Sequence, residues 1–109
     1  MASTLEPIRR ASVEVISEAF TIAGELNAKV VIHPGYSAWT EGKELSLLAL
    51  RRSLTEIGTA ADDSGVTFFV ENMPKWPYFF FCTPPKTTRI LMTATSVWMS
   101  GMHFCPGGP

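Results

Sequence analysis

The chain has 109 residues with a formal net charge of -1, and 46% of its residues are hydrophobic, values that suit one small folded domain rather than a disordered chain. No run of basic residues exceeds two, so we expect no nucleic-acid partner for this piece alone. The first residues lack the pattern of a signal peptide. Thr, Ser, His, Gly and Pro interrupt the uncharged stretch 90–109, so we expect no membrane span there. The two cysteines form no disulfide framework, and we expect a cytoplasmic protein.

The first two thirds of the chain predict two units, each a helix followed by a strand. Apolar residues recur at helical spacing over residues 8–26, Asn27 can end this helix, and the β-branched run at 29–32 is typical of a strand covered on both faces. A second helix is predicted over residues 41–63, ended by Gly65, with a strand at 66–70. The predicted apolar stripes are Val13, Ile16, Phe20, Ala23 and Ala28 in the first unit and Leu47, Leu50, Leu54, Ile57 and Ala61 in the second.

The last third predicts a third, weaker unit. A Pro-rich and aromatic loop at 73–83 precedes a helix expected over residues 85–96, since Thr83 and Pro84 resemble an N-cap and a first helical position. A third strand is expected at 97–104. Because strands joined by helical crossovers lie parallel, the predicted fold class is α/β, with the order αβαβαβ and a parallel three-stranded sheet in one domain, 1–109.

Residues with metal-binding chemistry follow each predicted strand: His33, Glu71 and Cys105. The carboxyl ends of parallel strands share one rim, and neighbouring strands lie about 4.8 Å apart, so His33 and Glu71 can converge on one divalent ion. Two alternatives stay open: His33 hydrogen-bonds only within its own loop, and Glu71 pairs with Lys75 or Arg10 at the surface. A cysteine such as Cys105 more often packs as a small apolar residue than binds a metal.

The loop at 74–81 reads Pro-Lys-Trp-Pro-Tyr-Phe-Phe-Phe. It is either a lid that stacks on a substrate ring or an apolar plug over the rim of the sheet. We favour the plug, because four adjacent aromatic side chains left exposed would form a costly apolar patch. Trp39 and Cys82 are expected to join it.

Three motifs carry a family resemblance. The segments Val-Val-Ile-His-Pro-Gly-Tyr at 30–36, Ala-Asp-Asp-Ser-Gly-Val at 61–66 and Val-Glu-Asn-Met-Pro at 70–74 resemble the middle of the xylose-isomerase-like TIM-barrel superfamily. That superfamily includes apurinic endonucleases of the endonuclease IV type and sugar isomerases and epimerases. The resemblance is best over residues 10–84 and covers about three of the eight βα units of such a barrel, whereas the tail 85–109 diverges. It implies an incomplete TIM-barrel segment.

The resemblance also implies a site. His33 and Glu71 match family metal ligands, and the implied cofactor is a divalent cation, zinc or manganese. Tyr36, Lys75 and Trp76 would contact the substrate, which by resemblance is a small sugar or sugar phosphate.

The chain departs from the family at the next strand end. The family pattern there resembles Gly-Met-Thr-Phe-Asp-Pro-Gly-His, whose Asp and His are further ligands, but this chain has Cys105 at the Asp position and Gly108 at the His position. Only two ligands are therefore matched, and a catalytic zinc commonly has three protein ligands. Cys105 would have to serve as the third.

The favoured function is a piece of a divalent-metal-dependent barrel that is inactive alone, with self-association through an exposed barrel-inner face and open sheet edges. One alternative is an active metal enzyme completed by self-association or by a partner chain. Another is a non-catalytic protein-binding domain that uses the aromatic loop as its contact surface.

Overall fold

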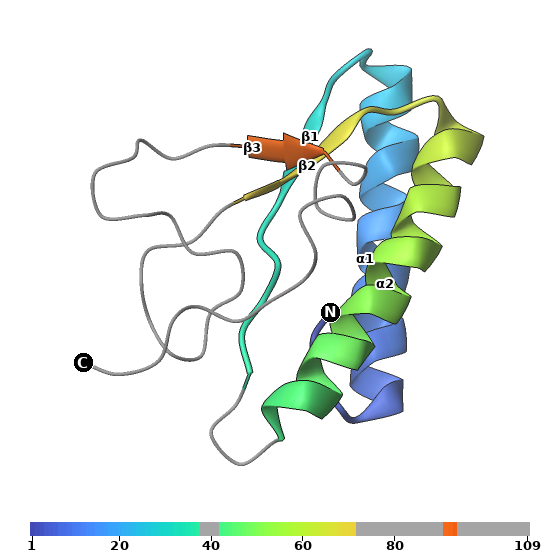
Figure 1. The fold of residues 1–109 in the computed structure, drawn as a ribbon. Helices are drawn as coiled ribbons and strands as arrows, with labels where there is room; N and C mark the ends of the chain where they lie inside the picture. The colour runs from blue at the N-terminus through green and yellow to red at the C-terminus, as the bar shows by residue number, and fades with distance from the viewer. Residues whose placement is uncertain (38–41, 72–90, 94–109) are drawn as a thin grey trace, which may run out of the picture.

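A computed structural model describes residues 1–37, 42–71 and 91–93 (Figure 1). Its elements are α1 (Glu6–Glu25), β1 (Val30–Ile32), α2 (Lys43–Ser64), β2 (Phe68–Glu71) and β3 (Leu91–Thr93). Figure 1 shows the two long helices together on one side of the strands, so the described chain has a helix layer and a sheet layer. No helix among these ranges has the length and apolar character needed to cross a membrane.

Both predicted helices are confirmed, and each ends where the sequence has a residue suited to the left-handed conformation. Gly65 has φ 66°, and the N–H of Val66 reaches back to the carbonyl of Ala61 at 2.9 Å. Asn27 has φ 53°, and the N–H of Ala28 donates to the carbonyl of Ala23 at 2.8 Å. These sharp ends let each strand start within a few residues of its helix.

The sheet has the order β1-β2-β3. β1 and β2 pair in parallel, with Val30 opposite Phe68 and Ile32 opposite Val70, as the βαβ pattern predicts. The predicted third unit is corrected: Leu91–Thr93, inside the expected helix 85–96, is a strand, and it pairs antiparallel to β2. The threonine-rich sequence there is a poor helix former, and the outer edge of β2 offers unpaired backbone groups that a short strand satisfies. The edge of β2, one of the two sheet edges expected to be open, is therefore paired. The predicted strand 97–104 lies outside the described residues.

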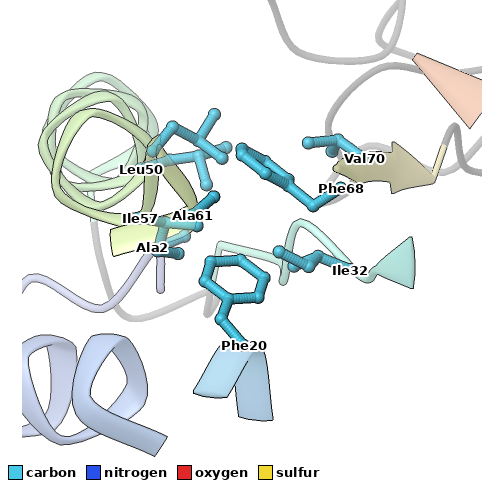
Figure 2. Close-up of a cluster of buried hydrophobic side chains, with 9 residues drawn as sticks. Ala2, Phe20, Ile32, Leu50, Ile57, Ala61, Phe68 and Val70 are labelled. Atoms are coloured by element: carbon cyan, nitrogen blue, oxygen red, sulfur yellow. The ribbon is translucent and has the colours of Figure 1, made fainter. Parts of the chain in front are cut away.

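The core lies between the helix layer and the sheet (Figure 2). The rings of Phe20 and Phe68 are 5.5 Å apart between centroids and tilted by 34°, joining α1 to β2. Most of both predicted stripes is confirmed, although Ala28 is exposed beyond the end of α1. The buried cluster comprises Ala2, Phe20, Ile32, Leu50, Leu54, Ile57, Ala61, Phe68 and Val70.

The two helices approach each other closely at their C-terminal ends. A Cβ atom built on Gly24 would lie 3.0 Å from the backbone carbonyl oxygen of Ser64. A larger residue at position 24 would therefore force the helices apart. The absence of a side chain at this position sets how closely α1 packs on α2.

A buried arginine joins the helices at the other end of α1. The side chain of Arg9 is 2% exposed and donates two hydrogen bonds to the carboxylate of Glu6, at 2.9 and 2.7 Å, and one to Glu56 of α2 at 3.0 Å. It also donates to Ser53 at 3.3 Å, and Ser53 donates to the backbone carbonyl of Met1 at 2.7 Å. The guanidinium thus ties α1, α2 and the N-terminal segment together.

This cluster sets the charge state of its members. The hydrogen bonds from Arg9, together with the positive charge of Arg52 3.3 Å from the same carboxylate, lower the pKa of Glu6 from 4.5 to about 2. Hydrogen bonds to Glu6 and then Glu56 raise the pKa of Arg9 above its usual range. Glu6 and Arg9 are therefore both ionised near neutral pH.

Truncation of a core leucine tests the packing. Leu54→Ala should lower the free energy of unfolding by about 2–5 kcal/mol, because Leu54 is 1% exposed and its loss leaves a cavity between α2 and the sheet. The control is Leu48→Ala, the same change on the same helix at a side chain that is 54% exposed, where the expected change is within about 0.5 kcal/mol. Urea unfolding followed by circular dichroism measures both, and equal effects would contradict the described core.

Acid titration of stability tests the arginine cluster. Because the pKa of Glu6 is lowered from 4.5 to about 2, its ionised form stabilises the fold above pH 4.5, and this contribution is lost as pH falls toward 2. Glu6→Gln should be less stable than the parent at pH 7, and the difference should shrink as pH falls below 4.5 and disappear below about pH 2. Glu14→Gln, on the exposed face of α1, is the control. A difference between Glu6→Gln and the parent that does not change with pH would refute the assignment.

Candidate metal centre at the strand ends

His33 and Glu71 lie at the same end of two paired parallel strands. Ile32 and Val70 are partners in the β1–β2 register, so His33 and Glu71 are the next residues along neighbouring strands. Neighbouring backbones in a sheet are about 4.8 Å apart. The parallel crossover through α2 therefore brings an imidazole and a carboxylate to one rim.

The two faces of these strands differ. Ile32 and Val70 are buried beneath the helices, whereas Val31, the middle residue of β1, is 51% exposed. Side chains alternate along a strand, so Phe69 does not share the helix-covered face with Val70. Lys29 confirms this placement, because its Nζ lies 6.0 Å from the centroid of the Phe69 ring. This second face, which we call the open face, carries Val31 and Phe69, with the cation of Lys29 at the end of β1 away from the rim.

The imidazole of His33 is held by its own loop. The backbone N–H of Gly35 donates to Nδ1 of His33 at 2.9 Å. A neutral imidazole that accepts at Nδ1 carries its proton on Nε2, so binding a metal through Nε2 would require the proton to move to Nδ1 and the Gly35 hydrogen bond to break. This contact is the loop hydrogen bond that the sequence left open as an alternative to metal binding.

The loop itself is firmly placed. Gly35 has φ 88°, a conformation that favours glycine, and its backbone passes close to Ala2, so that an added Cβ would be 3.7 Å from the Cβ of Ala2. Pro34 is buried, and buried Ser37 donates to Ser46 in the first turn of α2 at 3.1 Å. Contacts with Ala2 and with Ser46 of α2 therefore hold the loop after β1, and the side chain of His33 is exposed at the start of this loop.

Glu71 ends β2 and is half-buried. Its predicted alternative partner Arg10 is instead 4.0 Å from Glu6. Lys75, the other predicted partner, lies outside the described residues. His33 and Glu71 both take part in further interactions, so neither is a free ligand.

Of the three predicted metal ligands, the described residues include His33 and Glu71. Within 1–37, 42–71 and 91–93, no three histidine, cysteine, aspartate or glutamate side chains gather closely enough to hold an ion. A catalytic zinc commonly has three protein ligands, so His33 and Glu71 by themselves do not make such a site. Tyr36, a predicted substrate contact, is exposed in the loop after β1. The other predicted site residues, Trp76, Cys105 and the aromatic segment 74–81, lie outside the described part of the chain.

Sequence reasoning missed two features near the site. One is the burial of Arg9, for which the spacing of Glu6 three residues earlier was the available signal. The other is the pair of buried hydroxyls at Ser37 and Ser46, which have no signal in the sequence because the residues meet only after the loop is folded.

Comparisons with known proteins agree with this geometry. The xylose isomerase-like TIM barrel family matches residues 1–101. Two uncharacterised proteins of Methanocaldococcus jannaschii are 32% identical over 87 residues and 34% identical over 93 residues, covering 79% and 83% of this chain. The chain spans about a third of the length of these relatives, 35% and 32% respectively.

A solved structure is similar as well. The crystal structure of a D-tagatose 3-epimerase-like protein superposes with a TM-score of 0.67 at 35% identity, covering 73% of this chain and 31% of that one. The family match extends over most of the chain, and two helices packed on one face of paired parallel strands are what a segment of a βα barrel requires. The chain belongs to the xylose isomerase-like TIM barrel family.

Proposed function

We propose that this chain is a segment of a sugar isomerase or epimerase, in which His33 and Glu71 contribute two ligands to a divalent metal site and which is inactive alone. The observation that supports this most directly is the β1–β2 register, which brings the two side chains to neighbouring positions on one rim. Active sites of TIM barrels lie on this carboxyl-terminal rim. The position of His33 and Glu71 on this rim, rather than the fold alone, supports their proposed role as metal ligands.

The sugar branch of the family is favoured over the apurinic endonuclease branch. The solved structure that superposes on this chain is of an epimerase-like protein. The formal net charge of -1 gives no basic surface for a phosphodiester backbone. The substrate class that suits both observations is a small sugar with vicinal hydroxyl and carbonyl groups.

The residues of this chain have definable tasks at such a site. A divalent ion, zinc or manganese, would supply a Lewis acid that polarises a sugar carbonyl or hydroxyl. The carboxylate of Glu71 would hold the ion by charge, and the imidazole of His33 would do so once its Nδ1 carries the proton. Tyr36 can donate its phenolic hydrogen to a sugar hydroxyl, since the loop after β1 exposes it at the rim.

Completion by other strands is a second candidate. Val31 is 51% exposed on the open face, which in a closed barrel would point to the interior. Strands supplied by further copies or by a partner chain would cover this face and add ligands. In that arrangement the metal site would become active.

Metal titration tests the two ligands. Isothermal titration of the purified chain with Mn²⁺ or Zn²⁺ should show binding that Glu71→Gln weakens at least about tenfold, because the variant keeps the size of the side chain and removes its charge. Glu18→Gln, an equal loss of charge on the exposed face of α1, is the control and should bind as the parent does. Equal affinity of Glu71→Gln and the parent would contradict the proposal.

Activity should follow completion of the site. With Mn²⁺ and a panel of ketohexoses, the monomeric chain should give no epimer or aldose above background, because two ligands leave the ion without its full protein set. Chromatography of the sugars, with light scattering on the same samples, records activity and assembly together. Turnover by a monomer would refute inactivity of the isolated chain, and turnover confined to an oligomer would favour the second candidate.

A further inference from the structure

The loop after β1 holds the imidazole of His33 in a form that leaves no electron pair for a metal. A neutral imidazole has one nitrogen that carries the proton and one nitrogen that accepts. In His33 the accepting nitrogen is Nδ1, to which the backbone N–H of Gly35 donates at 2.9 Å. An ion at Nδ1 would take the electron pair that Gly35 uses, and an ion at Nε2 requires the proton on Nδ1, which then cannot accept. The bond from Gly35 and a metal at His33 therefore exclude each other at either ring nitrogen.

The His33 turn, which we define as residues 33–35, depends on the conformation of Gly35. This glycine has φ 88°, in the left-handed region, and that conformation directs its N–H back toward the ring. Pro34 is buried and its own ring fixes its φ. Ile32 before the turn and Ser37 after it are also buried, so the chain is held on both sides. Gly35 is the residue of the turn whose φ can change sign without steric cost, because it has no Cβ atom.

Metal binding would set two donors against each other if this turn kept its conformation. With the proton on Nδ1 of His33, that N–H and the N–H of Gly35 would face each other at the present separation of 2.9 Å. Two donors at this distance repel, because both hydrogens carry positive partial charge. Rotation of the peptide unit between Pro34 and Gly35 turns the second N–H away. The same rotation changes φ of Gly35 and takes this residue out of the left-handed region.

We propose that the His33 turn is a conformational switch of the strand-end site at His33 and Glu71. With Gly35 left-handed the turn is closed and withholds His33 from a divalent ion, and the ion binds His33 when the turn opens. This inference rests on the proposed function, since it takes His33 as a metal ligand. It adds that the metal-free chain is held in a state of low affinity, so part of the binding free energy of the ion is used to open the turn.

Two glycine variants test the switch by Zn²⁺ titration of the full chain. A left-handed backbone is unfavourable for an L residue, so Gly35→Ala penalises the closed turn and should bind Zn²⁺ roughly tenfold more tightly than the parent. The added Cβ would lie 3.7 Å from the Cβ of Ala2, an ordinary contact, so the strain comes from the backbone alone. General damage to the fold would weaken binding instead. Unchanged or weaker affinity of Gly35→Ala would overturn the proposal.

Gly65→Ala is the matched control. Gly65 also has a left-handed backbone, with φ 66°, and nothing lies within 4 Å of a Cβ added there. It ends α2 and precedes β2, so it lies at the opposite end of that strand from Glu71. Gly65→Ala should therefore lose stability through the same kind of strain and bind Zn²⁺ as the parent does. Circular dichroism and urea unfolding record the fold and stability of both variants.

Nuclear magnetic resonance of the ¹⁵N-labelled parent tests the switch without a glycine variant. In the absence of metal, a scalar coupling across the hydrogen bond should link the amide nitrogen of Gly35 to Nδ1 of His33. Saturating Zn²⁺ should abolish this coupling and shift the Gly35 amide signal, while the Gly65 amide signal stays in place. Glu71→Gln should need at least about tenfold more Zn²⁺ for the same change.

Failure of the switch and failure of the proposed function give different results. Zn²⁺ binding that Glu71→Gln weakens, with the Gly35 coupling still present at saturation, would overturn the switch and leave Glu71 as a ligand. An absence of Zn²⁺ binding in both the parent and Gly35→Ala would overturn the proposed metal ligands, and the switch with them.

Discussion

The crossover from β1 through α2 to β2 is the constraint on which the described structure depends. Leu50, Leu54 and Ile57 form the buried side of α2, which faces the sheet. Because α2 returns the chain from the end of β1 to the start of β2, the two strands run parallel. Because side chains alternate along a strand, a shift of one residue would move Ile32 or Val70 out of the core. The register is therefore set by apolar burial, and the placement of polar residues at the rim follows from it.

The strand-end site is a consequence of that register rather than a cause of it. His33 and Glu71 contribute little to the core, and they stand together because the residues before them are buried in register. The loop after β1 adds a second constraint, since Gly35 donates to His33 and Ser37 donates to Ser46. Metal binding would have to compete with the first of these bonds. Such competition would make affinity sensitive to the proton on the imidazole.

Arg9 shows how the helix layer is held at the end remote from Gly24. A buried charge is costly unless its donors are satisfied, and here Glu6, Glu56 and Ser53 accept from the guanidinium. Among the described residues, no buried side-chain nitrogen or oxygen lacks a hydrogen-bond partner. The close approach at Gly24 and the ion cluster at Arg9 align α1 with α2. That alignment leaves Val15 and Ile22 of α1 exposed.

The sequence by itself determined the helices, their glycine and asparagine ends, the two parallel strands and the family, because apolar periodicity and the residues suited to left-handed turns are local signals. It also placed His33 and Glu71 at strand ends, since each follows a β-branched or aromatic run. Only the tertiary structure decided that Leu91–Thr93 pairs antiparallel with β2, because pairing depends on a free edge that no local pattern records. It likewise decided the burial of Arg9 and the hydrogen bond of His33, which arise from neighbours brought together by folding.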